Sequence, residues 1–159
     1  MIELRAMTSA EFSDYVAYFV PDYATEISSN YDVDPAPALE QAERTIQEDL
    51  GQGVDTPEQE LTCIVLLGDA TDQPVGYLWC KPNPAEKTVF INDFYIKPDK
   101  RGRGYAREAL KALDVKYREL GYSAIGLRVA ADNKNAERLY LSAGYKPTGI
   151  NMRRVLRAG

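Results

Sequence analysis

Residues 101–106 read "RGRGYA" and lie between the apolar run "INDFYI" (residues 91–96) and the helical pattern "REALKALDVKYRELG" (residues 107–121). The turn therefore leads into the N-terminus of a helix, where the first backbone N–H groups have no partner inside the helix and the helix dipole is positive. Gly102 and Gly104 lack the Cβ atoms that would keep an anion away from these groups, and the two arginines add positive charge. The stretch is typical of a backbone site for a phosphate-like anion.

The glycine spacing excludes two familiar phosphate-binding loops. A P-loop requires G-x-x-x-x-G-K-S/T, and no Lys-Ser or Lys-Thr pair follows these glycines. A dinucleotide-binding fingerprint requires a third glycine three residues after Gly104, where Arg107 stands. For an isolated G-x-G, a turn that only joins a strand to a helix remains an alternative.

Three strand-like runs precede the turn, at residues 60–68, 74–82 and 86–98, and short links between them predict an antiparallel meander. After the turn, a helix ends at Gly121 and a further strand follows over residues 123–130. Two strands joined by a crossover helix pair in parallel, so the predicted sheet is mixed.

The two ends of the chain complete the predicted elements. Residues 2–7 alternate like a strand, and Pro21 is expected to interrupt the helix that follows. Residues 28–37 are expected to form a mobile connection to a second helix, which carries four apolar residues at helical spacing: Leu39, Ala42, Ile46 and Leu50. A short helix over residues 135–144 and one or two closing strands over residues 145–156 end the chain.

Composition restricts the chemistry. A chain of 159 residues with a net charge of −5 fits one globular domain and argues against a general nucleic-acid binder. It contains no histidine, so a general base must be a carboxylate, a tyrosine, an amine or a positioned water. Cys63 and Cys80 match no metal-ligand spacing and are expected to be buried free thiols. No segment approaches a membrane span, and we expect a cytoplasmic protein.

The turn and a downstream segment together resemble the Gcn5-related N-acetyltransferase (GNAT) superfamily. The family's pyrophosphate loop reads Arg or Gln, two residues, Gly, one residue, then Gly or Ala, which Arg101, Gly104 and Ala106 match. The stretch "NKNAERLYLSAGY" resembles the second family signature at these positions: Asn133, Ala136, Leu139, Tyr140, Gly144 and Tyr145. The resemblance covers about residues 61–157.

The resemblance implies a single α/β domain over residues 1–159, with a mixed, mostly antiparallel, splayed sheet flanked by helices. Residues 1–60 would form the acceptor-site helices and residues 61–157 the acetyl-CoA-binding core. Acetyl-CoA would be the cosubstrate, with no metal, and its pantetheine arm would lie between the diverging strands. The implied coenzyme-binding residues are Tyr95, Ile96, Arg101, Gly102, Arg103, Gly104, Tyr105, Ala106 and Asn133, the last also capping the next helix.

Tyr140 matches the tyrosine to which the family assigns protonation of the departing thiolate. A phenol of pKa about 10 that donates to a thiolate of pKa about 8.5 is uphill by only ~2 kcal/mol, so transfer concerted with bond cleavage is feasible. Without the motif, a core aromatic on an amphipathic helix would be the simpler interpretation of this residue.

The family motifs support the choice of a general base less directly than the choice of Tyr140. Many relatives place a glutamate on the strand before the loop, where this chain has Asn92 followed by Asp93. Strand alternation would send these two side chains to opposite faces, so only one could line the acceptor cleft. Asp93 is the candidate, directly or through water, with Tyr95 as second choice; a structural ion pair is the alternative role for Asp93.

The sequence therefore predicts an acetyltransferase that moves acetyl from acetyl-CoA to a primary amine by direct attack. Tyr15, Tyr18, Tyr23 and Glu26 could shape the acceptor pocket, although a solvated helix face explains them equally well. An inactive acyl-CoA-binding regulatory domain is the main alternative, and a nucleic-acid module is disfavoured by the acidic charge. The acceptor could be a small molecule or a peptide amine, and a homodimer stays open.

Overall fold

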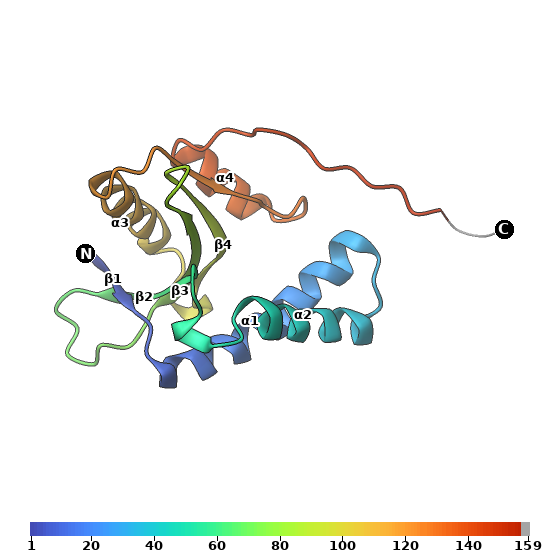
Figure 1. The fold of residues 1–159 in the computed structure, drawn as a ribbon, viewed down its shortest axis with the longest axis horizontal. Coiled ribbons are helices and arrows are strands. Elements are labelled where there is room, and N and C mark those ends of the chain that lie inside the picture. Colours follow the sequence, from blue (N-terminus) through green and yellow to red (C-terminus); the bar gives the residue numbers. More distant parts are fainter. Residues whose placement is uncertain (157–159) are drawn as a thin grey trace.

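The computed structural model describes residues 1–156 and shows a single α/β domain in which helices cover both faces of one sheet (Figure 1). The elements in chain order are β1 (Ile2–Ala6), α1 (Ser9–Tyr31), α2 (Pro35–Asp49), η1 (Gly53–Asp55), β2 (Glu60–Leu66), β3 (Gly76–Asn83), β4 (Thr88–Ile96), η2 (Pro98–Lys100), α3 (Tyr105–Glu119), β5 (Ala124–Leu127) and α4 (Lys134–Ser142).

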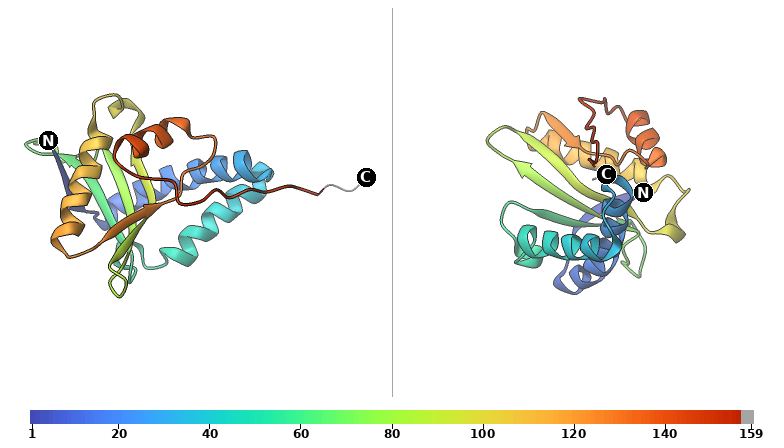
Figure 2. Two further views of the ribbon diagram at one scale, coloured as in Figure 1. Left: turned by 90° about the horizontal axis from the view of Figure 1, so that it is seen from above. Right: turned by 90° about the vertical axis from the view of Figure 1, so that its right-hand side faces the viewer.

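The sheet has the order β1-β2-β3-β4-β5, with antiparallel pairs up to β4 and a parallel pair between β4 and β5. The predicted mixed, mostly antiparallel sheet is therefore confirmed. The last two strands pair only from Thr88↔Ala124 to Ile91↔Leu127 and then separate. This separation leaves one backbone edge of β4 open over residues 92–96, and Figure 2 shows the sheet splaying there.

Apolar side chains pack on both faces of the sheet. On one face α1 buries Tyr15 and Phe19 against Trp79, while on the other α3 buries Leu110 and Leu113. Each helix or strand buries one of its faces. For this reason apolar residues recur about every second residue in the strands and about every 3.6 residues in the helices, and these patterns located the elements in the sequence.

The prediction that Pro21 interrupts the first helix is wrong. α1 runs unbroken through Pro21 to Tyr31. It does so although proline has no backbone N–H and cannot donate a hydrogen bond to the carbonyl one turn earlier in the helix. Buried residues on both sides of the proline, Phe19 before it and Ala24 and Ile27 after it, hold the helix against its neighbours. Tertiary packing offsets the local cost of about 3 kcal/mol.

The connection between the two N-terminal helices is correspondingly shorter than predicted. Most of residues 28–37 is helical, and only Asp32–Asp34 separate α1 from α2. Of the four apolar residues predicted to share one face of the second helix, Ala42 and Leu50 are buried and Ile46 packs on the core, whereas Leu39 is exposed and Ala38 is buried in its place. The small alanines allow the two helices to approach closely.

The closing strands predicted over residues 145–156 are not formed. A strand requires a neighbour within about 5 Å for backbone pairing. After α4 the chain instead runs outward, away from the sheet, as Figure 1 shows. Within the described 156 residues, no helix is both long and apolar enough to cross a membrane.

Candidate active site

A cleft of about 660 Å³ lies where β4 and β5 separate. Both halves of the chain contribute to its walls, because α1 and α2 face the splayed strands and α4 across it. Its lining consists of Tyr18, Phe19, Asp22, Tyr23 and Glu26 from α1, Thr45 and Asp49 from α2, Trp79, residues 90–96 of β4, Arg101, Ala106, residues 127–130, Asn133, and Asn135, Ala136, Leu139 and Tyr140 from α4.

A β-bulge at Asn92 shapes the floor of the cleft. Trp79 pairs with Asp93 and Cys80 with Ile91, so Asn92 is an extra residue without a partner on β3. The prediction that only one of Asn92 and Asp93 can line the cleft is therefore wrong: both do. Without a bulge, the side chains of Ile91 and Asp93 would point to the same face of the sheet. The extra residue reverses this, so that Ile91 packs with α3 while Asp93 points toward α1.

Two tyrosines of α1 hold the Asp93 carboxylate. The Tyr15 hydroxyl donates to Oδ2 at 2.8 Å, and the Tyr18 hydroxyl lies 3.2 Å from Oδ1. Burial raises the pKa of Asp93 to about 7, and the nearby carboxylates of Asp22 and Glu26 also raise it, while the two tyrosine hydrogen bonds oppose the shift. The carboxylate is thus fixed in position and poised to exchange a proton near neutral pH.

Tyr95 shares the face of Asp93, as the sequence predicts, and its ring stacks on Tyr18 with a centroid distance of 3.5 Å. The Arg101 guanidinium lies 5.3 Å from the Tyr95 centroid, and its Nε donates to the Ile96 carbonyl at 2.8 Å. Arg101 therefore ties the start of the turn to the end of β4, where the sheet opens.

The turn over residues 101–106 has the backbone that its glycines predict. Gly102 and Gly104 have φ of 76° and 83°, and an added Cβ would meet no protein atom within 4 Å at either position. Gly104 is the N-cap residue of α3, but it has no side chain that could accept a hydrogen bond. The backbone N–H groups of Tyr105 and Ala106 at the start of α3 are therefore not capped by Gly104. The open space and uncapped amides suit an anion at this helix end.

Tyr140 and Asn133 bring α4 to the opposite wall. The Asn133 side chain accepts from the Ala136 N–H at 3.2 Å, so the predicted cap of this helix is confirmed. The Tyr140 ring lies against Phe94 of β4 with a centroid distance of 6.4 Å. Burial, and secondarily the charge of Asp93, raise the pKa of the Tyr140 phenol well above its usual value, which keeps it protonated at neutral pH.

Sequence reasoning missed two carboxylates at the cleft, Asp22 and Asp49, and named Glu26 only as a possible acceptor residue. Asp22 and Glu26 come from α1 and Asp49 from α2, and burial raises the pKa of both α1 carboxyls. On an unbroken α1, Tyr18, Asp22 and Glu26 are each four residues apart and share one face. This spacing was available in the sequence, but the assumed break at Pro21 concealed it.

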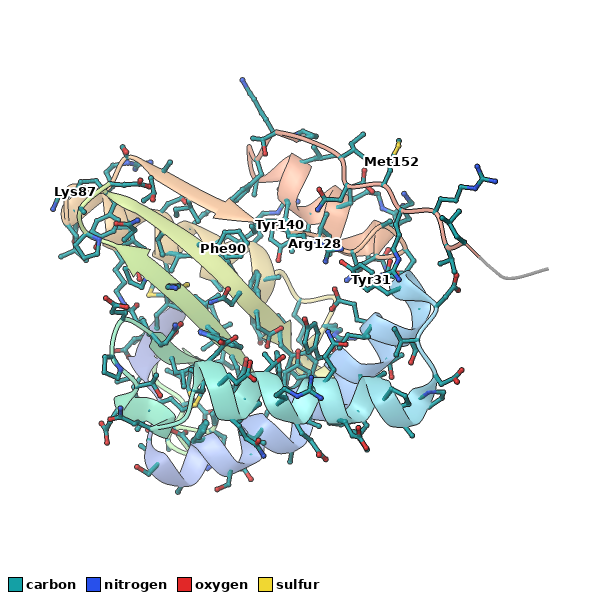
Figure 3. All side chains as sticks on the ribbon, turned by 45° about the vertical axis from the view of Figure 1, so that its right-hand side comes forward. Tyr31, Lys87, Phe90, Arg128, Tyr140 and Met152 are labelled. Atoms are coloured by element: carbon teal, nitrogen blue, oxygen red, sulfur yellow. The ribbon has the colours of Figure 1, made fainter. Side chains whose placement is uncertain are left out.

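Arg128 closes one end of the cleft. It follows β5, lies 3.6 Å from the Glu26 carboxylate and donates to the Tyr31 hydroxyl at 2.6 Å, as Figure 3 shows for Arg128 and Tyr31. Asp132 adds a further link, since it accepts from the Asn30 amide at 3.3 Å. The end of α1 is thereby fixed to the segment after β5.

Most of the predicted site residues meet at this cleft. Asp93, Tyr95, Ile96, Arg101, Ala106, Asn133 and Tyr140 line it, while Gly102, Arg103, Gly104 and Tyr105 form the adjoining turn and first helical residue. Of the predicted acceptor residues, Tyr18, Tyr23 and Glu26 line it too, whereas Tyr15 lies behind Asp93. Among residues 1–156, no three His, Cys, Asp or Glu side chains are grouped to hold a metal.

Comparison with known proteins identifies the class of protein. The model of the acetyltransferase (GNAT) family matches residues 22–145. YycN of Bacillus subtilis, named an uncharacterized N-acetyltransferase, is 32% identical over 98% of this chain and 99% of its own. YdgE of the same organism, similarly named, is 30% identical over 96% of this chain and 97% of its own.

Solved structures agree with the sequence comparison. The crystal structure of YycN aligns with a TM-score of 0.90 over 99% of this chain and all of that chain. A spermidine N-acetyltransferase of Vibrio cholerae, solved with CoA and spermine, aligns with a TM-score of 0.66 at 19% identity, covering 99% of this chain and 88% of the other. The chain belongs to the GNAT family and is an acyl-CoA-dependent acetyltransferase.

Proposed function

We propose that this enzyme transfers acetyl from acetyl-CoA to a primary amine of a small cationic acceptor by direct attack. The observation that carries the proposal is a single cleft that holds Asp93, with a pKa of about 7, on one wall and the protonated Tyr140 on the other, next to an uncapped helix N-terminus. Residues 1–60 would supply the acceptor side and residues 61–157 the coenzyme side.

The raised pKa of Asp93 suits a base for an amine. An alkylammonium of pKa about 10.4 leaves roughly one molecule in 2,500 unprotonated at pH 7, a penalty of about 4.6 kcal/mol. Relative to an ordinary Asp of pKa about 3.9, a value of about 7 narrows the pKa difference between donor and acceptor from about 6.5 to about 3.4. Proton transfer from the bound ammonium to Asp93 thereby becomes more favourable.

The amine nitrogen would then attack the thioester carbonyl and form the C–N bond, the C–S bond would break, and Tyr140 would give its proton to the sulfur. The nitrogen would lose its second proton to solvent on becoming an amide, Tyr140 would regain a proton from solvent, and Asp93 would release the proton taken from the ammonium. Because burial raises the pKa of Tyr140, full transfer before cleavage would be costly, and donation must accompany the breaking bond. Cys63 and Cys80 are buried, lie outside the cleft lining and have thiol pKa values raised to about 12 by burial, which supports direct attack over a cysteine-bound acetyl intermediate.

The carboxylates of α1 and α2 support an acceptor with a second positive charge. Asp22, Glu26 and Asp49 line the same cleft as Asp93, and Arg128 contacts only Glu26 among them. A diamine could place one amine at Asp93 and a second near these groups. The Vibrio cholerae relative solved with CoA and spermine is consistent with this class of acceptor.

A screen of mono-, di- and polyamines, aminoglycosides and peptide amines with acetyl-CoA tests the proposal, with products read by mass spectrometry and thiol release read in parallel. We expect acetylated diamine or polyamine together with stoichiometric thiol. Binding of acetyl-CoA without product from any amine would instead support the inactive regulatory domain.

Replacing Asp22 with Asn should raise KM for a diamine by about 5- to 10-fold and change KM for a monoamine of similar length by less than twofold, since one ion pair in a partly solvated cleft contributes about 1 kcal/mol. Asp14→Asn is the matched control, because Asp14 lies on the same helix and outside the cleft lining. Equal KM changes for both amines would contradict a second-charge subsite.

Replacing Gly104 with Val should weaken acetyl-CoA binding at least about tenfold in calorimetry, because a branched side chain would occupy the space proposed for the pyrophosphate and strain a φ of 83°. Gly68→Val is a matched control, since Gly68 has a φ of 84°, equally open surroundings and a position in the turn after β2. Unchanged affinity in a folded Gly104→Val protein would remove the pyrophosphate assignment.

A further inference from the structure

The Asp93 carboxylate, which is the base in the proposed function, has to return a proton to solvent in every cycle. A bound acceptor amine would lie on the cleft side of this carboxylate and hinder access of water there. On β3 its partner is Trp79, which does not titrate. The titratable groups that face Asp93 are Tyr15, Tyr18, Asp22 and Glu26 from α1, Tyr95 from β4 and Tyr140 from α4.

The two tyrosines that donate to Asp93 differ in what lies beyond them. Tyr15 is 0% exposed, and its ring is packed against Phe19 and Tyr77 at centroid distances of 5.7 and 5.4 Å. A proton passed to its hydroxyl would remain inside the apolar core. Tyr15 therefore holds the Oδ2 atom of Asp93 in place but cannot carry a proton to solvent.

Tyr18 stands between Asp93 and a second carboxyl group. Its hydroxyl lies 3.2 Å from Oδ1 and 3.3 Å from Oδ2 of Asp93, and its side chain lines the cleft. Asp22 follows one turn later on the same face of α1 and is exposed to solvent. Burial raises the pKa of the Asp22 carboxyl, while Arg101 and a hydrogen bond from the Tyr18 hydroxyl lower it. One hydroxyl thus serves a half-buried carboxylate and an exposed one.

Packing fixes the Tyr18 ring and leaves its hydroxyl free to turn. The ring stacks on Tyr95 at a centroid distance of 3.5 Å and on Tyr77 at 6.2 Å. A phenol has one proton to donate and lone pairs with which to accept another. Rotation of the O–H bond alone therefore redirects the proton of Tyr18 from one carboxylate to the other.

We propose that Tyr18 relays the proton from Asp93 to Asp22, from which it passes to water. The protonated Asp93 gives its proton to the Tyr18 oxygen while the original Tyr18 O–H bond breaks and that proton moves to the Asp22 carboxylate. Tyr18 is neutral before and after, and rotation of its hydroxyl restores the starting arrangement. Burial, and then the charge of Asp93, raise the pKa of Tyr18 well above its usual value, so the two transfers must be concerted.

Tyr18→Phe and Tyr15→Phe form a matched pair, because each keeps the ring and removes one hydroxyl from Asp93, but only the first removes the link to Asp22. The assay uses a saturating monoamine, so that a second acceptor charge does not involve Asp22, at about pH 8.5 in dilute buffer. We expect kcat of Tyr18→Phe to fall about 10-fold or more and added imidazole, a small proton carrier, to restore it at least about fivefold. Tyr15→Phe should gain less than about twofold from imidazole.

Asp22→Asn changes an exposed residue and tests the other end of the relay. Its kcat for the monoamine should also fall and be restored by imidazole, whereas the ion pair proposed above affects KM for a diamine. The double variant of Tyr18→Phe and Asp22→Asn should be no slower than Tyr18→Phe alone, since two residues of one path do not contribute additively. Amide product is measured by mass spectrometry against an enzyme-free control, because imidazole itself attacks thioesters.

Equal restoration of the two tyrosine variants by imidazole would overturn the relay, as would an unchanged kcat in Tyr18→Phe or a further loss in the double variant. Asp93→Asn in the same assay separates the relay from the function on which it rests. Normal turnover of Asp93→Asn would overturn the base and the relay together. Slow turnover of Asp93→Asn, with a Tyr18→Phe variant that imidazole does not restore, would overturn the relay alone.

Discussion

Replacing Asp93 with Asn is expected to lower kcat at pH 7 by about 100-fold or more, the scale of one general base. The asparagine amide is nearly the same size as the carboxylate and can still exchange hydrogen bonds with the Tyr15 and Tyr18 hydroxyls, so the fold should be kept. What the variant cannot do is accept the proton of the ammonium. The measurement is steady-state kinetics with a saturating amine found in the acceptor screen.

The matched control is Asp99→Asn, which removes a carboxylate from the exposed turn η2 shortly after β4 and should leave kcat within twofold. Partial recovery of the Asp93→Asn variant is expected at high pH, where free amine becomes abundant. Turnover within a factor of two or three of the wild type at pH 7 would leave Asp93 a structural role, and Tyr95 or a water held by Asn92 would be the next candidate base.

The pH profile gives an independent test of the same residue. Because the pKa of Asp93 is raised to about 7, the carboxyl is protonated and inactive as a base below that pH and becomes a base above it. In a plot against pH, the wild-type kcat/KM should therefore rise through about pH 7. Titration of the amine substrate should affect kcat/KM separately, near pH 10. The rise of kcat/KM near pH 7 should be absent in Asp93→Asn. If that rise persists unchanged, it reports the titration of a group other than Asp93.

The second large effect is expected for Tyr140→Phe, which keeps the ring against Phe94 and deletes only the hydroxyl. Acetyl-CoA affinity should survive while kcat falls by about 10- to 1,000-fold, the range of a general-acid contribution. The loss should shrink for a thioester whose thiol leaves more easily, since a stable thiolate needs less protonation.

Tyr145→Phe is the control for this experiment. Tyr145 lies edge-on to Tyr140 at a centroid distance of 5.6 Å, but its ring is outside the cleft lining, so turnover should stay within twofold. If Tyr140→Phe loses the same factor with good and poor leaving groups, the hydroxyl positions the coenzyme and donates no proton.

The sequence by itself determined the features that depend on neighbouring residues. Glycines at 102 and 104 require positive φ in a turn before a helix, and apolar periodicity marks a helix or strand wherever one face is buried. These local signals located the meander, the crossover helix and the loop, and the predicted family and mixed sheet are confirmed. The roles of Asp93 and Tyr140 stay predictions.

The tertiary structure decided the features in which distant segments compete with local preference. Burial on both sides of Pro21 keeps α1 continuous and aligns Asp22 and Glu26 with the cleft, although proline alone favours a break. Pairing with β3 creates the bulge at Asn92, which brings its side chain to the cleft beside Asp93. Residues 145–156 have a strand-like sequence pattern, but a strand forms only where a second backbone is available to pair with it, and the fold of the described chain places none beside this segment.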